Sequence, residues 1–302
     1  MRQEPVQPGL GLTHEHGRSV RVTWRDRQLF RYVYRPWEAQ VESPRPYIHP
    51  LWTLGGRPVS LYRPHDHVWH KGMSVALPNV GPDNFWGGPT YLRARGGYVQ
   101  LANNGTQRHD AFTRLGGDGG RVGLTEELTW VAEDGRVVLA EERTLDVTVR
   151  PDDAAWRLDL TTVLRNAGAE DLAIGSPGSE GRAGAAYGGL FWRGPRSFSD
   201  GVVRTPAADG ADDLNGTRAP WMAYTGRHDG DGARSTLLVV DHPDNPGYPT
   251  PWFVRSAVYA VLCPAPFAEV RRLAPDEKLA LRYGVVVADG DLDRAACARL
   301  AA

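Results

Sequence analysis

The chain has 302 residues, a formal net charge of -1, and 35 Lys and Arg residues that are spread along it rather than clustered. This distribution argues against nucleic acid or an anionic membrane surface as a main partner. The longest apolar runs, such as 259–263 and 285–288, are far too short to cross a bilayer, and the N-terminal residues lack the apolar core of a signal peptide. We therefore expect a cytoplasmic protein that is large enough to bury a sizeable core.

The predicted elements are nearly all strands. In chain order they span 20–24, 29–34, 121–130, 136–150, 155–166, 236–241, 257–262 and 280–287. Apolar and polar residues alternate within 144–149 and 156–161, which is the period of half-buried antiparallel strands. Asp291 is expected to cap a short helix over 292–300. With no alternation of strands and helices, the sequence predicts an all-β fold, a large antiparallel β-sandwich with a short C-terminal helix, as a single domain over 1–302.

The densest group of chemically active side chains lies in the ten residues 63–72. This segment holds three of the nine histidines together with Asp66, and it lacks the apolar periodicity that would make them core residues. On a helical turn His67 and His70 would share a face, whereas on an extended segment His65 and His67 would. We predict that His67 and His70 are the central catalytic groups and that Asp66 orients one of the rings. The alternative is that these side chains only satisfy the backbone of a loop.

Two more loops carry histidines that we expect to close the same site. His49 lies upstream of the cluster, and His242 lies far along the chain in a proline-stiffened segment that also presents Asn245 as a substrate-binding residue. A divalent metal bound by some of His49, His67, His70 and His242 is a variant of this prediction, since imidazole is a common metal ligand. The spacing differs from the His-Glu-x-x-His helix of zinc proteases.

The middle of the chain supplies a candidate carboxylate and a candidate cation. Glu142 is the predicted catalytic base, and Arg143 or Arg255 would hold substrate oxygens. Alternation along a strand places Glu142 and Arg143 on opposite faces. The alternative for this pair is a solvated or paired surface.

Several tryptophans stand near Gly, Pro or His in turn-rich segments. An indole beside polar donors suits a flat, hydroxylated ligand such as a sugar. We predict that Trp86, Trp192 and Trp252 contact the substrate. The alternative is that the sandwich simply buries them.

The order of several motifs resembles a soluble bacterial family that carries the name methane oxygenase PmoA. The motifs are 45–51 (RPYIHPL), 64–72 (PHDHVWHKG), 84–87 (NFWG), 187–193 (YGGLFWR), 242–246 (HPDNP) and 282–287 (RYGVVV). The resemblance runs from about residue 36 to residue 289. It implies a supersandwich similar to galactose-mutarotase-like and glycoside-hydrolase-associated proteins, and a place in carbohydrate catabolism. It does not imply methane oxidation, because the membrane subunit of that name spans a bilayer and this chain has no such segment.

Two functions from different classes follow. In the first, the protein is an enzyme that performs isomerisation, elimination or hydrolysis on a sugar or keto-sugar derivative, since imidazole can give and take a proton near neutral pH. In the second, it is a noncatalytic carbohydrate-binding or accessory subunit. A metal-dependent oxygenase is a weaker third alternative. A small-molecule carbohydrate is the expected partner, and a homodimer is left open. Every site prediction depends on the histidine-bearing loops meeting in space.

Overall fold

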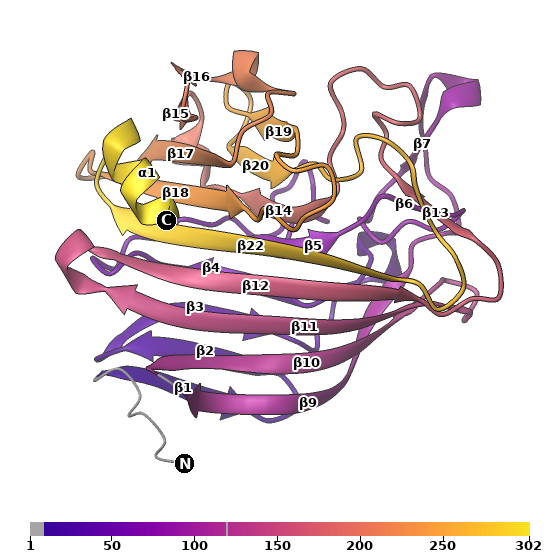
Figure 1. Cartoon of the computed structure of the whole chain (residues 1–302), viewed down its shortest axis with the longest axis horizontal. Coiled ribbons are helices and arrows are strands. Elements are labelled where there is room, and N and C mark those ends of the chain that lie inside the picture. Colours follow the sequence, from indigo (N-terminus) through magenta and orange to yellow (C-terminus); the bar gives the residue numbers. More distant parts are fainter. Residues whose placement is uncertain (1–8, 119) are drawn as a thin grey trace.

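The computed structural model describes residues 9–118 and 120–302 and consists mainly of two large antiparallel sheets (Figure 1). The eight-stranded sheet runs in the order β1 (Leu10–Glu15), β2 (Ser19–Trp24), β3 (Arg27–Val33), β4 (Tyr47–Leu51), β5 (Met73–Ala76), β14 (Gly189–Arg193), β20 (Val261–Pro264) and β19 (Trp252–Arg255). The nine-stranded sheet runs in the order β16 (Asp209–Gly210), β15 (Val202–Arg204), β17 (Trp221–Arg227), β18 (Arg234–Asp241), β22 (Lys278–Asp289), β12 (Ala155–Asn166), β11 (Val137–Arg150), β10 (Arg121–Val131) and β9 (Thr106–Asp118).

Smaller elements lie in the connections between the large sheets. One short sheet holds β21 (Arg271–Leu273), β13 (Leu172–Gly175) and β6 (Asn79–Val80), and another holds β7 (Thr90–Leu92) and β8 (Gly97–Val99). Short 3-10 helices are η1 (Gln40–Glu42), η2 (Arg93–Arg95), η3 (Pro151–Asp153), η4 (Arg196–Phe198) and η5 (Asp212–Leu214). In Figure 1, β6, β7 and β13 gather at the end of the molecule opposite the C-terminal helix.

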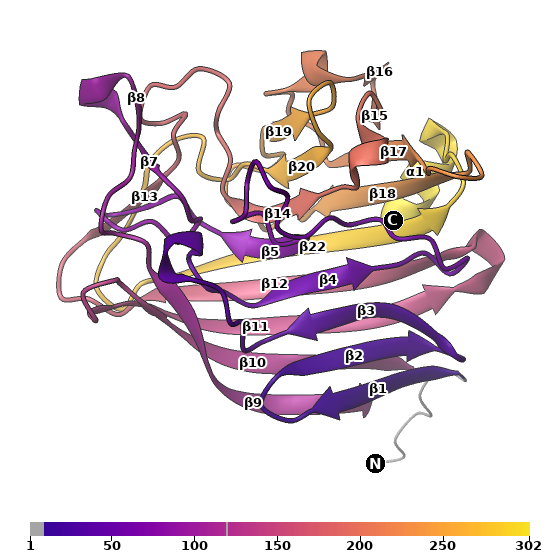
Figure 2. The same cartoon turned by 180° about the vertical axis from the view of Figure 1, so that it is seen from behind.

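The main core lies between the two sheets and follows from the alternation of side chains along the strands. Trp156 and Leu158 on β12 are fully buried and belong to one cluster with Phe30 of β3. The rings of Phe30 and Trp156 stack with their centroids 5.6 Å apart. Figure 2 shows β1 to β4 in front of the long strands of the other sheet. The predicted all-β antiparallel sandwich is therefore confirmed, while the single domain over 1–302 stays a prediction.

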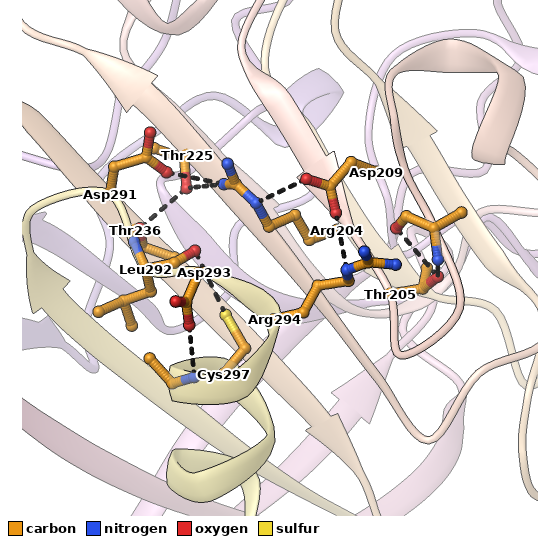
Figure 3. Close-up of polar contacts among 12 residues, drawn as sticks. Arg204, Thr205, Asp209, Thr225, Thr236, Asp291, Leu292, Asp293, Arg294 and Cys297 are labelled. Carbon is orange, nitrogen blue, oxygen red and sulfur yellow. Dashed lines mark hydrogen bonds and ion pairs between the residues drawn. The ribbon is translucent and has the colours of Figure 1, made fainter.

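The C-terminal helix α1 (Arg294–Ala301) is confirmed, but its cap differs from the prediction. Asp293, rather than Asp291, accepts a hydrogen bond from the backbone N–H of Ala296 at 2.8 Å. Asp291 instead pairs with Arg204, at 2.8 Å, and with Arg234. Figure 3 shows Arg204 between Asp291 and a second carboxylate, that of Asp209.

Helix α1 covers the outer face of the nine-stranded sheet. Its buried residues Cys297 and Leu300 form a small cluster with Leu238 of β18 and Val286 of β22. Within residues 9–118 and 120–302, the structure has no helix long and apolar enough to traverse a bilayer.

One predicted strand starts later than expected. The segment 257–262 was predicted as extended, but the strand β20 begins at Val261 because 256–260 forms the connection from β19. This connection carries the half-buried Tyr259.

Candidate functional site

A cavity of about 270 Å³ lies against strands β14, β19 and β20, where they meet the loops 52–72, 81–89 and 176–188. Its walls are predominantly aromatic and basic. The lining residues are His67, Trp69, His70, Trp86, Gly87, Pro89, Tyr98, Arg182, Tyr187, Phe191, Phe253, Arg255, Tyr259 and Val261. The structure thus brings together four of the predicted site residues, His67, His70, Trp86 and Arg255.

Alternation along β14 decides which of its side chains reach the cavity. Leu190 and Trp192 belong to the core between the sheets, whereas Phe191 belongs to a separate cluster on the outer face. Arg193 follows Trp192 and shares the outer face with Phe191. The cavity is therefore built on the side of the eight-stranded sheet that faces away from the nine-stranded sheet.

The same alternation corrects two of the predicted tryptophans. Trp192 and Trp252 are each 1% exposed and lie in the core, so neither can stack on a ligand. The indole Nε1 of Trp192 donates to the backbone oxygen of Val59 at 2.7 Å, and that of Trp252 donates to Ala219 at 2.8 Å. Phe191 and Phe253, which are next to these tryptophans in sequence and point the opposite way, line the cavity instead.

His67 and His70 come together through two consecutive turns. The N–H of His67 donates to the oxygen of Pro64 at 3.0 Å, and the N–H of His70 donates to the oxygen of His67 at 2.9 Å. The two rings stack with centroids 4.7 Å apart and an interplanar angle of 21°. The helical-turn alternative therefore describes the pair, and His65 lies elsewhere, 3.0 Å from Arg196.

Asp66 binds His67, as predicted for a carboxylate that orients a ring. Its Oδ2 lies 3.0 Å from His67 Nδ1, and its Oδ1 accepts from Arg196 at 2.9 Å. Partial burial alone would raise the pKa of Asp66, but the hydrogen bonds from His67, its own backbone and Arg196 lower it to about 2. The carboxylate is therefore ionised throughout the physiological range.

His70 is buried among rings and has an unsatisfied nitrogen. Its centroid lies 4.7 Å from that of Phe191 and 6.0 Å from that of Trp86. Burial, reinforced by the nearby His67 and Arg193, holds the pKa of His70 well below its usual range. Its Nδ1 is buried and has no hydrogen-bond partner. The cavity wall therefore includes a neutral imidazole with one buried, unpartnered nitrogen.

Arg193 is the second buried group with free polar atoms at this site. Its side chain is 0% exposed, and Nε, Nη1 and Nη2 all lack hydrogen-bond partners. The guanidinium stacks 4.0 Å from the ring centroid of Tyr259, and its closest carboxylate contact is a long one, 3.9 Å to Asp66. Burial lowers the pKa of Arg193 to about 10. A cation therefore lies behind the wall of the cavity in a low-dielectric environment.

A buried arginine fixes the two loops that carry the histidines and Trp86. Arg45 is 1% exposed, and its Nη2 donates to the oxygen of Trp69 at 2.6 Å while its Nη1 donates to the oxygen of Trp86 at 2.9 Å. Next to it, the Lys71 ammonium binds the Glu42 carboxylate, which also takes two hydrogen bonds from Arg63. The loops are thus fixed by hydrogen bonds and ion pairs from buried side chains, as a preformed site requires.

The Trp86 loop depends on glycine at a close approach. Gly87 has a φ of +100°, and a Cβ there would lie 2.6 Å from both the Glu42 oxygen and the Trp69 Cβ. Asn84 shapes the same turn by accepting from the N–H groups of Trp86 and Gly87 at 2.8 and 2.9 Å. The turn at 84–87 therefore positions Trp86 in the wall of the cavity.

Glu142 and Arg143 do not reach the cavity, because β11 belongs to the nine-stranded sheet. Glu142 is exposed on the outer face of that sheet. Arg143 points into the sandwich, where its Nε lies 2.7 Å from Glu141 Oε1. The structure thus corrects both predicted roles: neither side chain can touch a ligand in this cavity.

The remaining predicted residues also lie outside the cavity wall. His49 Nδ1 bonds to Ser60 Oγ at 2.8 Å, and burial lowers its pKa to about 4. His242 is 46% exposed in its side chain and accepts from the N–H of Asp244. Asn245 is buried and ties its loop to the Arg282 backbone through two bonds of 2.7 Å. The predicted convergence of all histidine loops is thus limited to the 63–72 segment.

Sequence reasoning missed several residues at the site, among them Tyr98, Tyr187, Arg182 and Arg193. Tyr98 and Tyr187 join through their hydroxyls at 2.7 Å, and Arg182 donates to Tyr98 at 2.8 Å. Tyr187 and Arg193 stand in the 187–193 motif, so alternation from Trp192 could have identified Arg193. Nothing in the sequence around Tyr98 or Arg182 marks them, since Tyr98 on the short strand β8 and Arg182 on the loop 176–188 reach the cavity only through long-range packing.

The candidate metal ligands do not form a cluster. Within residues 9–118 and 120–302, the structure has no group of three or more His, Cys, Asp or Glu side chains arranged to hold a metal ion. His49 and His242 lie apart from the cavity that His67 and His70 line. The four candidate histidines therefore do not gather at one place.

Residues 19–302 match the model of the group described as "Family of unknown function (DUF6807)", so the chain belongs to that family. No curated protein matches the chain. The name PmoA does not occur in this description, and that resemblance stays a prediction.

Solved structures with similarity to the chain include glycosidases. An alpha-galactosidase from Lactobacillus brevis aligns over 97% of this chain and 41% of its own, with 11% identity and a TM-score of 0.41. A GH36 alpha-galactosidase from Geobacillus stearothermophilus, in complex with 1-deoxygalactonojirimycin, aligns over 93% of this chain and 40% of its own, with 11% identity and a TM-score of 0.38. The chain thus spans less than half the length of either enzyme.

Proposed function

We propose that this member of the DUF6807 family binds a small hydroxylated ligand, a sugar or keto-sugar, in the cavity and transfers a proton with the Asp66–His67 pair. The observation that carries the proposal is a carboxylate-oriented imidazole in the wall of an aromatic cavity. Such a pair is the usual arrangement of a histidine general base and its orienting group.

The aromatic walls support a sugar-like ligand. Trp86 lies between Tyr187 and Phe191, with ring centroids 4.5 and 4.7 Å away. Aromatic faces beside hydroxyl and guanidinium donors suit a ring with apolar C–H faces and polar edges. A cavity of about 270 Å³ suits a monosaccharide better than an oligosaccharide.

The donor set narrows the reaction class. Because the ionised Asp66 can only accept, His67 donates to it through Nδ1–H, and in the neutral ring Nε2 then has the lone pair that accepts a proton. Among the lining residues there is no Asp or Glu. Glycoside hydrolysis normally needs two carboxylates that flank the scissile bond. The arrangement therefore supports isomerisation or elimination, through proton abstraction beside a carbonyl, better than hydrolysis.

His70 has a different role from His67 in this proposal. Its burial keeps the ring neutral, so it offers a hydrogen bond rather than a charge to the ligand. A neutral imidazole can polarise a carbonyl oxygen while His67 removes the neighbouring proton.

The test is proton exchange at carbon. Candidate ketoses and aldoses are incubated with the protein in deuterated water, and loss of the C–H signal next to the carbonyl is followed by NMR. We expect exchange in the wild type and a fall of about 10²- to 10⁴-fold in His67→Ala, with a smaller fall in Asp66→Asn. His242→Ala is the matched control, because this exposed histidine lies outside the cavity, and it should exchange at the wild-type rate.

A noncatalytic binding protein is the second candidate function, favoured by the aromatic lining itself. Under that function a sugar quenches the fluorescence of Trp69 and Trp86 but shows no exchange in any variant. Exchange that persists unchanged in His67→Ala would contradict the proposed role of the Asp66–His67 pair.

A further inference from the structure

We propose that the ligand of this cavity carries an anionic group, a carboxylate or a phosphate, which Arg182 and Arg255 bind. This inference rests on the proposed function, because it assigns a substrate class to the same cavity. It makes the ligand a sugar acid or a sugar phosphate rather than a neutral sugar.

The charge of the cavity wall is the first argument. The lining residues include two arginines and two histidines, and they include no Asp or Glu. Asp66 lies behind His67 and is already shared between His67 and Arg196. A wall with cations and no anion favours an anionic ligand, since desolvation inside a cavity strengthens the attraction.

Arg255 is held in place by neutral groups only. Its Nη1 donates to the oxygen of Val254 and its Nη2 to the oxygen of Gly184, both at 2.7 Å, and its guanidinium lies 4.4 Å from the ring centroid of Phe253. These contacts fix the guanidinium without neutralising it. Within the described part of the chain no carboxylate pairs with it, so it retains N–H donors and its full charge for a ligand.

Arg182 lies on the loop 176–188 and is likewise held by neutral groups. Its Nη1 donates to the Tyr98 hydroxyl at 2.8 Å, and its guanidinium lies 4.9 Å from the centroid of that ring. It too has no carboxylate partner among residues 9–118 and 120–302. Arg182 is two residues from Gly184, the residue that accepts from Arg255. The loop 176–188 therefore carries Arg182 and, through the Gly184 oxygen, holds Arg255 of β19. Two guanidiniums without carboxylate partners thus reach one cavity, an arrangement suited to carboxylate or phosphate oxygens.

Arg193 adds an independent observation. It is a fully buried cation with no hydrogen bond on any nitrogen, and it stacks under Tyr259, which itself lines the cavity. A buried guanidinium without hydrogen bonds lowers the stability of the fold, and such a cost is retained where a function requires the charge. Its positive charge, 3.9 Å from Asp66 at the nearest, adds to the positive potential at the cavity.

Paired sugars that differ only in charge test the proposal. Quenching of tryptophan fluorescence is measured with galacturonate against galactose, with glucuronate against glucose, and with glucose 6-phosphate. We expect one or more of the anionic sugars to bind at least tenfold more tightly than its neutral counterpart. The Arg182→Gln and Arg255→Gln variants should each lose about tenfold or more of that preference, since charge-assisted hydrogen bonds are about twice as strong as neutral ones. Carboxylate and phosphate probes identify the source of the charge.

The control variant is Arg108→Gln, an exposed arginine on β9 that pairs with Asp110 and lies outside the cavity. It should keep the preference. Neutral sugars that bind as tightly as their acids, with exchange still dependent on His67, would overturn this inference and leave the proposed function standing. Absence of binding by every acid, phosphate and neutral sugar would contradict both.

Discussion

Two fully buried arginines, Arg143 and Arg193, have opposite surroundings. Arg143 faces the interior between the sheets, where its nitrogens contact Glu141, Gln107 and Tyr32. Arg193 faces the cavity side of the eight-stranded sheet, where none of its nitrogens has a hydrogen-bond partner. Burial is equal for the two side chains, and only the partners differ.

The same contrast extends to the histidines of the two regions. His109 Nδ1 lies 2.6 Å from the buried Glu126 carboxylate, whereas His70 Nδ1 has no partner. A buried polar network that is fully paired stabilises one packed arrangement, whereas buried polar groups without partners cost stability. The comparison therefore separates the paired buried groups of the sandwich interior from the unpaired ones at the cavity, which residue type and burial alone do not.

The largest expected effect is the loss of stability on replacing Arg143, the arginine with hydrogen-bond partners. Arg143→Met should lower the free energy of unfolding by about 3–5 kcal/mol, because it leaves Glu141 buried without its cation. Urea unfolding followed by tryptophan fluorescence measures this loss. Replacement at the exposed neighbour, Glu142→Gln, is the control and should change stability by less than about 0.5 kcal/mol. A loss below about 1 kcal/mol for Arg143→Met would show that the network contributes little.

The next largest effect is the loss of stability in acid that buried neutral histidines cause. Burial lowers the pKa of His49 from 6.5 to about 4, and it lowers that of His70 as well. Below about pH 6.5 the unfolded chain therefore binds protons that the folded chain does not bind. The free energy of unfolding has its full value above that pH and falls as the pH drops toward 4.

The slope is at most about 1.4 kcal/mol per pH unit for each histidine. His70→Phe should flatten the dependence of unfolding free energy on pH between about 7 and about 5, because one proton fewer distinguishes the two states. Urea titrations at several pH values measure this slope. An unchanged slope in His70→Phe would contradict this assignment.

The smallest expected effect is that of Arg193→Leu on stability. Removal of the three unpartnered nitrogens should raise the free energy of unfolding by about 1–3 kcal/mol. Loss of the contact with Tyr259 should lower it by about 0.5–2 kcal/mol. The net change should lie within about 1 kcal/mol, measured by urea unfolding beside Arg143→Met. If Arg193→Leu destabilised the protein as much as Arg143→Met, the proposed difference between the two arginines would be wrong.

The predictability of the site differs from residue to residue for a geometric reason. Local turns decided the pairing of His67 with His70 and of Asp66 with His67, and these contacts lie within a few residues of one another. Arg255 and Trp86 were also identified, from their chemistry and their turn-rich neighbours. Trp192 and Trp252 were predicted to contact a ligand but lie in the core, because a strand's alternation fixes only which residues oppose each other and not which face is covered.

Local sequence determined the antiparallel strands, the C-terminal helix and the histidine segment, because period-two alternation, capping residues and turns act between near neighbours. Tertiary structure alone decided where the cavity lies. It set the nine-stranded sheet against one face of β14 and β19, which buried Arg143 with Glu141 and left Arg193 on the other face. It also brought Tyr98 of β8, Arg182 and Tyr259 to the cavity that His67 lines, since only long-range packing can join segments so far apart in the chain.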